Sequence, residues 1–129
     1  MDGSERISLI LEAYKSGIKP QVENLFQGYP IKNAEHTSDD KAFVGGSWKQ
    51  YWKIFAQEDF PVLCPFCGKP LNEDDIDGCH VVLGKSILFE NVIYNRMKYI
   101  IPGHHECNMQ LGEEFRSKIQ LKAVEAIEK

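Results

Sequence analysis

The chain has 129 residues, with 15 Lys and Arg against 19 Asp and Glu, which gives a formal net charge of −4. A hydrophobic fraction of 43% and a charged fraction of 26% are ordinary for one soluble globular domain. Non-specific binding of DNA or RNA depends on Lys and Arg that neutralise phosphates, and the chain as a whole offers no such surplus. The composition therefore excludes a strongly basic protein that coats DNA or RNA non-specifically.

The N-terminal residues lack the basic start and apolar stretch of a secretory signal, and no apolar run approaches the ~20 residues of a membrane span. We expect a cytoplasmic protein with no membrane partner. A cytosolic setting keeps thiols reduced, so the four cysteines favour a metal site over disulfides or a redox pair.

Two helices are predicted in the first half of the chain. Residues 4–15 form the first, because apolar residues recur with the spacing of one helix face, at Ile7, Ile10, Leu11 and Tyr14. Ser47 is the expected N-cap of the second, whose aromatic residues share one face: Trp48, Tyr51, Trp52 and Phe55. We expect this face to lie in the core rather than stack on nucleic-acid bases. Between the helices, residues 21–26 suggest a short helical turn and residues 33–41 a polar loop.

Two short Cys- and His-containing motifs carry the main functional signal. The first is Cys64-Pro-Phe-Cys67-Gly, and the second is His104-His-Glu-Cys107-Asn. Zinc prefers four tetrahedral thiolate or imidazole donors, and a Cys-x-x-Cys pair supplies two from one tight turn. His104 stands three residues before Cys107 and repeats that spacing, whereas His105 and Cys79 do not. We predict structural zinc bound by Cys64, Cys67, Cys107 and His104, with His105 and Cys79 as alternatives for the fourth ligand.

The remaining elements surround these motifs. Residues 72–78 are acidic but do not match the spacing of a calcium-binding loop, so a solvated turn is expected there. Residues 79–83 and 98–102 have the composition of strands, and residues 112–129 suggest a closing helix.

We call the two motifs, at residues 64–68 and 104–108, the first and second knuckles. Along the chain, the first knuckle is followed by a strand, a loop, a second strand, the second knuckle and a helix. This order resembles that of the zinc-stapled HNH, or His-Me finger, family. The resemblance covers about residues 60–115. It rests on three segments: Cys64-Pro-Phe-Cys67-Gly68, Gly78-Cys79-His80-Val81-Val82 and Tyr99-Ile100-Ile101-Pro102-Gly103-His104-His105-Glu106-Cys107-Asn108. It implies an α+β fold in which a helical region at residues 1–59 packs on a small ββα-metal module at residues 60–129, with a C-terminal helix.

The resemblance also implies an activity. In the family, a His in the position of His80 acts as general base on a water that attacks a phosphodiester of DNA or RNA. A second divalent ion such as Mg²⁺ stabilises the leaving oxygen, and Asn108 matches the residue after the last zinc ligand. The chain departs from the family pattern at Cys79, where many members carry an acid or another His, and at Tyr99, where the central Asn falls. Asp77 or Asn95 are candidate substitutes.

These departures support a second hypothesis of a different class. In a non-catalytic relative, the zinc frame is a scaffold, the acidic surface binds or regulates a protein partner, and His80 is a residue of the fold. The acidic charge and the two departures favour this second hypothesis, whereas the retention of His80 and Asn108 at matching places favours the nuclease.

Overall fold

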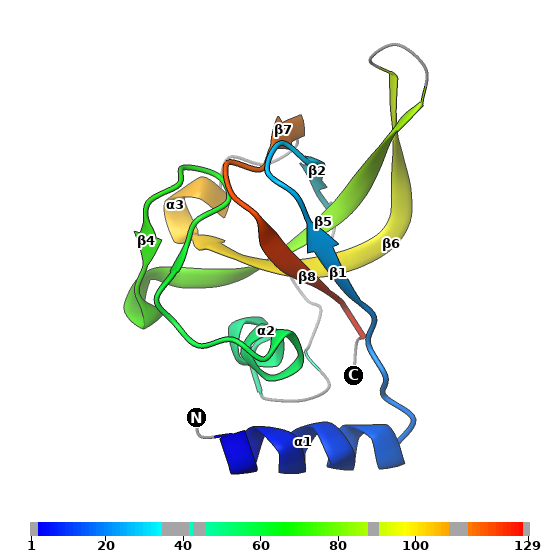
Figure 1. Ribbon diagram of the computed structural model, residues 1–129, viewed down its shortest axis with the longest axis vertical. Coiled ribbons are helices and arrows are strands. Elements are labelled where there is room, and N and C mark those ends of the chain that lie inside the picture. The colour runs from blue at the N-terminus through cyan, green and yellow to red at the C-terminus, as the bar shows by residue number, and fades with distance from the viewer. Residues whose placement is uncertain (1–2, 35–41, 43–45, 88–90, 109–113, 128–129) are drawn as a thin grey trace.

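The computed structural model describes residues 3–34, 42, 46–87, 91–108 and 114–127 (Figure 1). This part of the chain has a mixed α/β fold, built mostly on an antiparallel sheet with a few helices. The predicted combination of helices and strands is confirmed, while the ββα-metal arrangement stays a prediction. The elements in chain order are α1 (Gly3–Lys15), β1 (Val22–Leu25), β2 (Pro30–Asn33), α2 (Trp48–Ala56), β3 (Val62–Leu63), β4 (Pro70–Leu71), the 3-10 helix η1 (Glu73–Asp75), β5 (Ile76–Ile87), β6 (Asn91–His104), α3 (His105–Asn108), β7 (Glu114–Arg116) and β8 (Leu121–Glu125).

Among the described residues, six strands form one sheet in the order β1-β8-β6-β5-β2-β7, and β3 pairs with β4 in a separate ribbon. The centre of the six-stranded sheet is the long antiparallel hairpin of β5 and β6, whose register begins with Ile76 opposite His104. The register shifts between Val82 and Gly84, and the far end of the hairpin projects from the body (Figure 1). Because β1 and β2 also belong to this sheet, the first and second halves of the chain share one framework.

Helix α2 is confirmed where the aromatic pattern predicted it, and it packs on the sheet. The hydroxyl of Ser47 caps it by accepting a hydrogen bond from the backbone N–H of Gln50 at 3.3 Å. Tyr51 and Trp52 are fully buried, as expected for core residues. The Trp52 indole N–H donates to the carbonyl of Lys122 at 2.9 Å, which joins the helix to β8. Such buried aromatic residues supply much of the apolar area of a small domain.

The first predicted helix is also confirmed as α1, but most of its predicted apolar face points away from the core. Ala13 is buried and Ile10 is half-buried against the cluster around α2. By contrast, Ile7, Leu11 and Tyr14 are exposed. In Figure 1, α1 crosses one end of the molecule, with α2 between it and the sheet.

Two helix predictions are wrong. Residues 21–26 contain strand β1 rather than a helical turn, and β1 pairs with β8 from Val22 opposite Val124 to Leu25 opposite Leu121. The predicted helix at residues 112–129 contains strands β7 and β8 instead. Pairing partners on both sides of β8 outweigh the local helical pattern, because strand formation depends on neighbours that periodicity cannot show.

Other predicted segments are placed as follows. Asn33, expected in a loop, ends β2, whereas residues 35–41 of that loop lie outside the described residues. The predicted strands at residues 79–83 and 98–102 are confirmed inside β5 and β6. Within the described part of the chain, we find no helix with the length and apolar character needed to cross a bilayer.

Candidate metal centre

The first half of the site is the turn between β3 and β4. The backbone N–H of Cys64 donates to the carbonyl of Lys69 at 2.8 Å, and the N–H of Gly68 donates back to the carbonyl of Cys64 at 2.7 Å. Gly68 has a φ of 77°, in the left-handed region that glycine adopts without a steric penalty. This tight turn holds Cys64 and Cys67 at one end of the ribbon, and the first is fully buried.

The second half is the end of β6 and the helix α3 that follows it. His104 is the last residue of β6, and Cys107 is the third residue of the short helix α3. Gly103, the residue before His104, lets the two halves of the site approach each other closely. A Cβ atom added to it would lie 2.6 Å from the ring of Phe66 in the first knuckle. The absence of a side chain at this position therefore allows the Phe66 ring to pack directly over β6.

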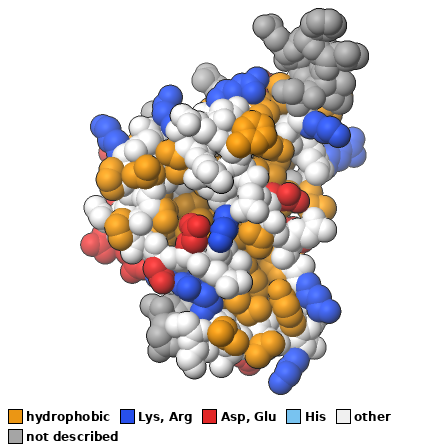
Figure 2. Space-filling view, viewed as in Figure 1, with side chains coloured by type: hydrophobic (Ala, Val, Ile, Leu, Met, Phe, Trp, Pro, Cys, Tyr) orange, Lys and Arg blue, Asp and Glu red, His pale blue; other side chains and the backbone are white. Residues whose placement is uncertain are grey.

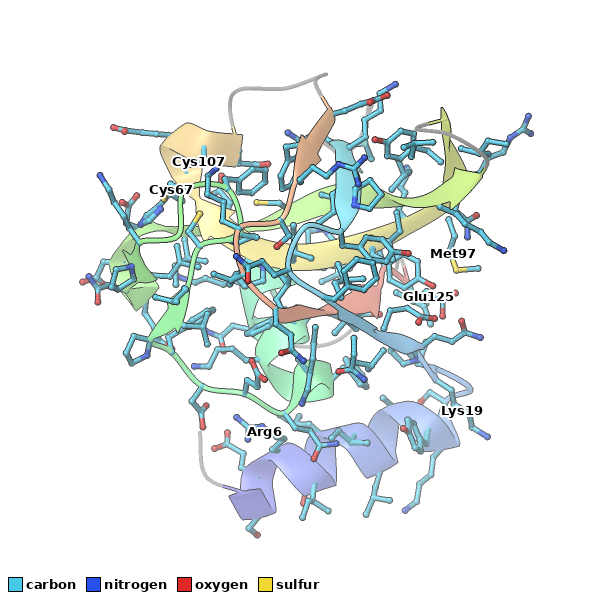
Figure 3. All side chains as sticks on the ribbon, turned by 45° about the horizontal axis from the view of Figure 1, so that its top comes forward. Arg6, Lys19, Cys67, Met97, Cys107 and Glu125 are labelled. Carbon is cyan, nitrogen blue, oxygen red and sulfur yellow. The ribbon has the colours of Figure 1, made fainter. Side chains whose placement is uncertain are left out.

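The structure brings the four predicted ligands together. One donor atom from each of Cys64, Cys67, His104 and Cys107 lies within 4.8 Å of the others. Sulfurs about 2.3 Å from a tetrahedral zinc are about 3.8 Å apart, so the donors are close to the spacing that a bound ion would require. All four cysteines are free thiols, so no disulfide competes for the site. Figure 3 shows Cys67 next to Cys107 of α3.

The imidazole of His104 is oriented for coordination through one particular nitrogen. Its Nε2 lies 3.2 Å from the carbonyl oxygen of Pro70, which can only accept, so Nε2 carries the proton and donates. The other nitrogen, Nδ1, then holds the lone pair, and it lies 3.3 Å from the sulfur of Cys67. Metal-binding histidines are commonly fixed in this way by a carbonyl or carboxylate on the second nitrogen.

The thiols influence one another strongly. Burial tends to raise the pKa of Cys67, but a hydrogen bond from the backbone N–H of Lys69, together with neighbouring side chains, lowers that pKa to about 7. Burial raises the pKa of Cys107 to about 12, and the nearby charges of Cys64 and Cys67 act in the same direction. Crowded sulfurs of this kind are stabilised as thiolates when a cation lies between them.

A carboxylate beside the four donors orients the second knuckle. Asp77, near the start of β5, accepts a hydrogen bond from Nδ1 of His105 at 2.7 Å and one from the amide of Asn108 at 3.0 Å. His105 is thus turned to Asp77 and lies outside the donor group. Sequence reasoning did not find this role for Asp77, because it depends on the register that sets Asp77 opposite Gly103.

Cys79 is also outside the donor group. It is fully buried in β5, its thiol donates to the backbone carbonyl of Asp77 at 3.7 Å, and burial raises its pKa well above the ordinary value. A buried neutral thiol behaves as a small apolar side chain. Cys79 therefore serves as packing beneath the knuckle.

The two predicted catalytic residues lie on opposite faces of β5. The ring of His80 is buried and makes an edge-to-face contact with Trp48 of α2, with ring centroids 4.7 Å apart. Its face also includes Gly78, where an added Cβ would lie 2.5 Å from the Cβ of Trp48. Successive side chains of a strand point to opposite faces, so Asp77 and its partner Asn108 lie on the other side.

A scan of protein-family models, a search of curated proteins and a search of solved structures each find no match to this chain.

Proposed function

We propose that the protein is a zinc-stabilised, non-catalytic interaction module, related to the HNH group in the arrangement of its zinc ligands. The observation that carries the zinc assignment is the convergence of three thiols and one imidazole within 4.8 Å of one another. Soft thiolates with imidazole select zinc over the hard ions magnesium and calcium, which prefer oxygen ligands.

The proposed zinc is structural. Four protein donors complete a tetrahedral shell and leave no position for water or substrate, which is the pattern of structural zinc sites. The donors come from two segments that are forty residues apart in sequence, the β3–β4 turn and the β6–α3 junction. A bound ion would hold the ribbon against the central hairpin, and sites of this kind contribute about 10 kcal/mol or more to folding.

The placement of His80 supports the non-catalytic alternative over a nuclease. A general base must reach the proton that it abstracts, and a second metal would have to lie between His80 and Asn108. His80 is only 8% exposed and packs on α2, whereas Asn108 is engaged with Asp77 on the opposite face of the sheet. These separate contacts favour a role for both side chains in the fold over joint binding of one catalytic ion.

Cobalt substitution tests the metal assignment. Protein refolded with Co²⁺ should show the intense visible bands of a tetrahedral thiolate complex, and a stoichiometric amount of zinc should bleach them. Cys67→Ser should weaken and shift these bands, whereas Cys79→Ser should leave them in place because Cys79 lies outside the donor group. Bands that depend on Cys79 and not on Cys67 would refute the ligand set.

A cleavage assay tests the absence of catalysis. Zinc-loaded protein incubated with plasmid or single-stranded DNA and Mg²⁺ or Mn²⁺ should not cleave it above the level of the His80→Ala variant. Metal-dependent cleavage that His80→Ala abolishes would instead establish the nuclease hypothesis. Because the variant retains all four donors, its zinc content serves as the control for folding.

A further inference from the structure

A partly open cavity of about 590 Å³ lies beside the central hairpin of β5 and β6. Its lining includes two tyrosines, two apolar residues and two residues of opposite charge: Tyr29, Tyr99, Leu83, Ile93, Glu23 and Lys85. They come from β1, β5, β6 and the position just before β2, which the fold brings together. The four donor residues are not part of this lining, so the cavity is separate from the metal centre.

A bulge in the hairpin accounts for the cavity. The register of β5 and β6 shifts between Val82 and Gly84, where residues 95–97 of β6 lie opposite a single residue of β5. The side-chain oxygen of Asn95 accepts a hydrogen bond from the backbone N–H of Met97 at 3.1 Å, which supports the bulged backbone. A bulge bends its strand and interrupts pairing, and bulges are common beside functional sites. This one lies where the hairpin leaves the body of the protein.

One end of the cavity is acidic. Burial raises the pKa of Tyr29 and of Tyr99, and the negative charge of Glu23 raises both further, so the carboxylate lies near both phenol groups. The ring of Tyr29 is held edge to face against Phe26, with ring centroids 5.0 Å apart. Among the described residues, no basic side chain forms an ion pair with Glu23. A cation placed here would therefore gain the attraction of Glu23 without displacing a partner from it.

We propose that the cavity binds an organic cation with N–H donors and a single positive charge, an alkylammonium or an alkylguanidinium. Glu23 is its counter-ion, and the phenol oxygens of Tyr29 and Tyr99 accept its hydrogen bonds. The ring of Tyr29 also offers a π face, to which cations are attracted. Leu83 and Ile93 provide an apolar wall for the alkyl chain, as in most small-molecule sites.

Lys85 limits the ligand to one positive charge. It follows Val81 by four residues, and Val81 pairs with Tyr99, so Lys85 lies about 13 Å along β5 from the acidic end. A second cationic group at the far end of the ligand would approach Lys85 and be repelled. Figure 2 shows acidic side chains below the Lys and Arg side chains that gather where the hairpin leaves the body.

Titration followed by nuclear magnetic resonance tests the proposal. Pentylammonium added to zinc-loaded, ¹⁵N-labelled protein should cause saturable shifts of the backbone amides of Glu23, Leu83 and Tyr99, with a millimolar Kd because the ligand is small. Pentanol has the same shape without the charge and should bind about 10-fold more weakly. A capped peptide with one Lys separates two sources of the cation. Tighter binding of the peptide supports a protein partner, and tighter binding of pentylammonium supports a free amine.

Variants test the role of each charge. Glu23→Gln should weaken pentylammonium binding about 10-fold, because it removes the counter-ion and keeps the shape of the side chain. Glu12→Gln is the matched control, since Glu12 is exposed on α1, and it should bind like the wild type. In the wild type 1,5-diaminopentane should bind several-fold more weakly than pentylammonium, and Lys85→Ala should remove this difference.

The outcomes that overturn the proposal do not involve the metal centre, so they leave the zinc assignment intact. Far-UV circular dichroism and zinc content verify that each variant is folded. The absence of saturable shifts overturns the cation site, and so does equal binding of pentanol or an affinity that Glu23→Gln leaves unchanged. If the wild type binds the diamine as tightly as pentylammonium, the restriction to one charge is overturned.

Discussion

Nδ1 of His105 lies 2.7 Å from the carboxylate of Asp77, and this contact joins the beginning of β5 to the short helix α3, which contains the proposed zinc ligand Cys107. The same carboxylate also receives the amide of Asn108. His105 and Asn108 stand at the two ends of α3, so Asp77 restrains the whole turn that carries Cys107. Asp77 therefore restrains the segment that carries two of the four donor residues, His104 and Cys107.

Removing this carboxylate should weaken metal binding. Asp77→Ala is expected to lower zinc affinity by about 10- to 100-fold, the usual effect of losing a group that orients a ligand. Competition with a chromophoric chelator measures the affinity. Asp74→Ala is the control, because Asp74 is exposed on η1 and should not change the affinity. Equal affinities for both variants would show that Asp77 has no positioning role.

Zinc affinity should rise with pH, since zinc binds thiolates. The pKa of Cys67 is about 7 and that of Cys107 is about 12. Below about pH 7, zinc must displace protons from both thiols, whereas above it Cys67 is already ionised and Cys107 still carries its proton. The slope of log affinity against pH should therefore be steeper by about one proton below pH 7. Calorimetry in buffers of different ionisation enthalpy counts the released protons, and an affinity independent of pH would contradict the assignment.

A methyl group at Gly103 should disturb the metal site through the neighbouring ring of Phe66. The added Cβ would meet the Phe66 ring, so Gly103→Ala is expected to displace the knuckle and to cost about 1–3 kcal/mol of stability, as overpacking does. Zinc affinity should fall with it. Chemical denaturation and chelator competition measure the two effects. Gly3→Ala is the control, because nothing lies within 4 Å of a Cβ at that position.

A compensating change makes the Gly103 prediction specific. Phe66→Leu removes part of the ring that the new methyl group meets, so the double variant should recover much of the lost affinity. If the loss of zinc affinity in the double variant equals the sum of the losses in the two single variants, the close contact between Phe66 and β6 is not the cause of the Gly103→Ala effect.

The hydroxyl of Tyr51 should stabilise the end of β8. It donates to the carbonyl of Glu125 at 2.5 Å and accepts from the backbone N–H of Ile127 at 3.1 Å. Tyr51→Phe leaves both partly buried backbone groups without this partner, which is expected to cost about 1 kcal/mol. Urea denaturation of zinc-loaded, dilute protein measures the loss. Tyr14→Phe changes an exposed ring and should fall within about 0.5 kcal/mol of wild type.

Local spacing explains what the sequence predicted well. Two ligands three residues apart sit on one turn whatever the rest of the fold does, so the pairs Cys64 with Cys67 and His104 with Cys107 could be found without a structure. The same reasoning located α2, where Ser47 and the aromatic spacing act within one helix. The role of Asp77 could not be found in this way, because it depends on the register of β5 against β6.

The C-terminal segment shows the opposite case. Phe115, Ile119 and Leu121 gave a helix-like pattern, but residues Leu121–Glu125 lie between β1 and β6 and pair with both. Backbone pairing to strands distant in sequence decided the outcome, and periodicity carries no information about it. The orientation of α1 could not be predicted for the same reason, because packing against α2 determines which of its apolar side chains are buried.

The most direct test of the central claim is the zinc content of the purified protein, measured by elemental analysis against protein concentration. We predict about one zinc per chain in the wild type, bound tightly enough to survive gel filtration, because four donors form a closed structural site. A Cys64→Ser, Cys107→Ser double variant should contain far less. A wild type without zinc that keeps its structure in a strong chelator would contradict the assignment.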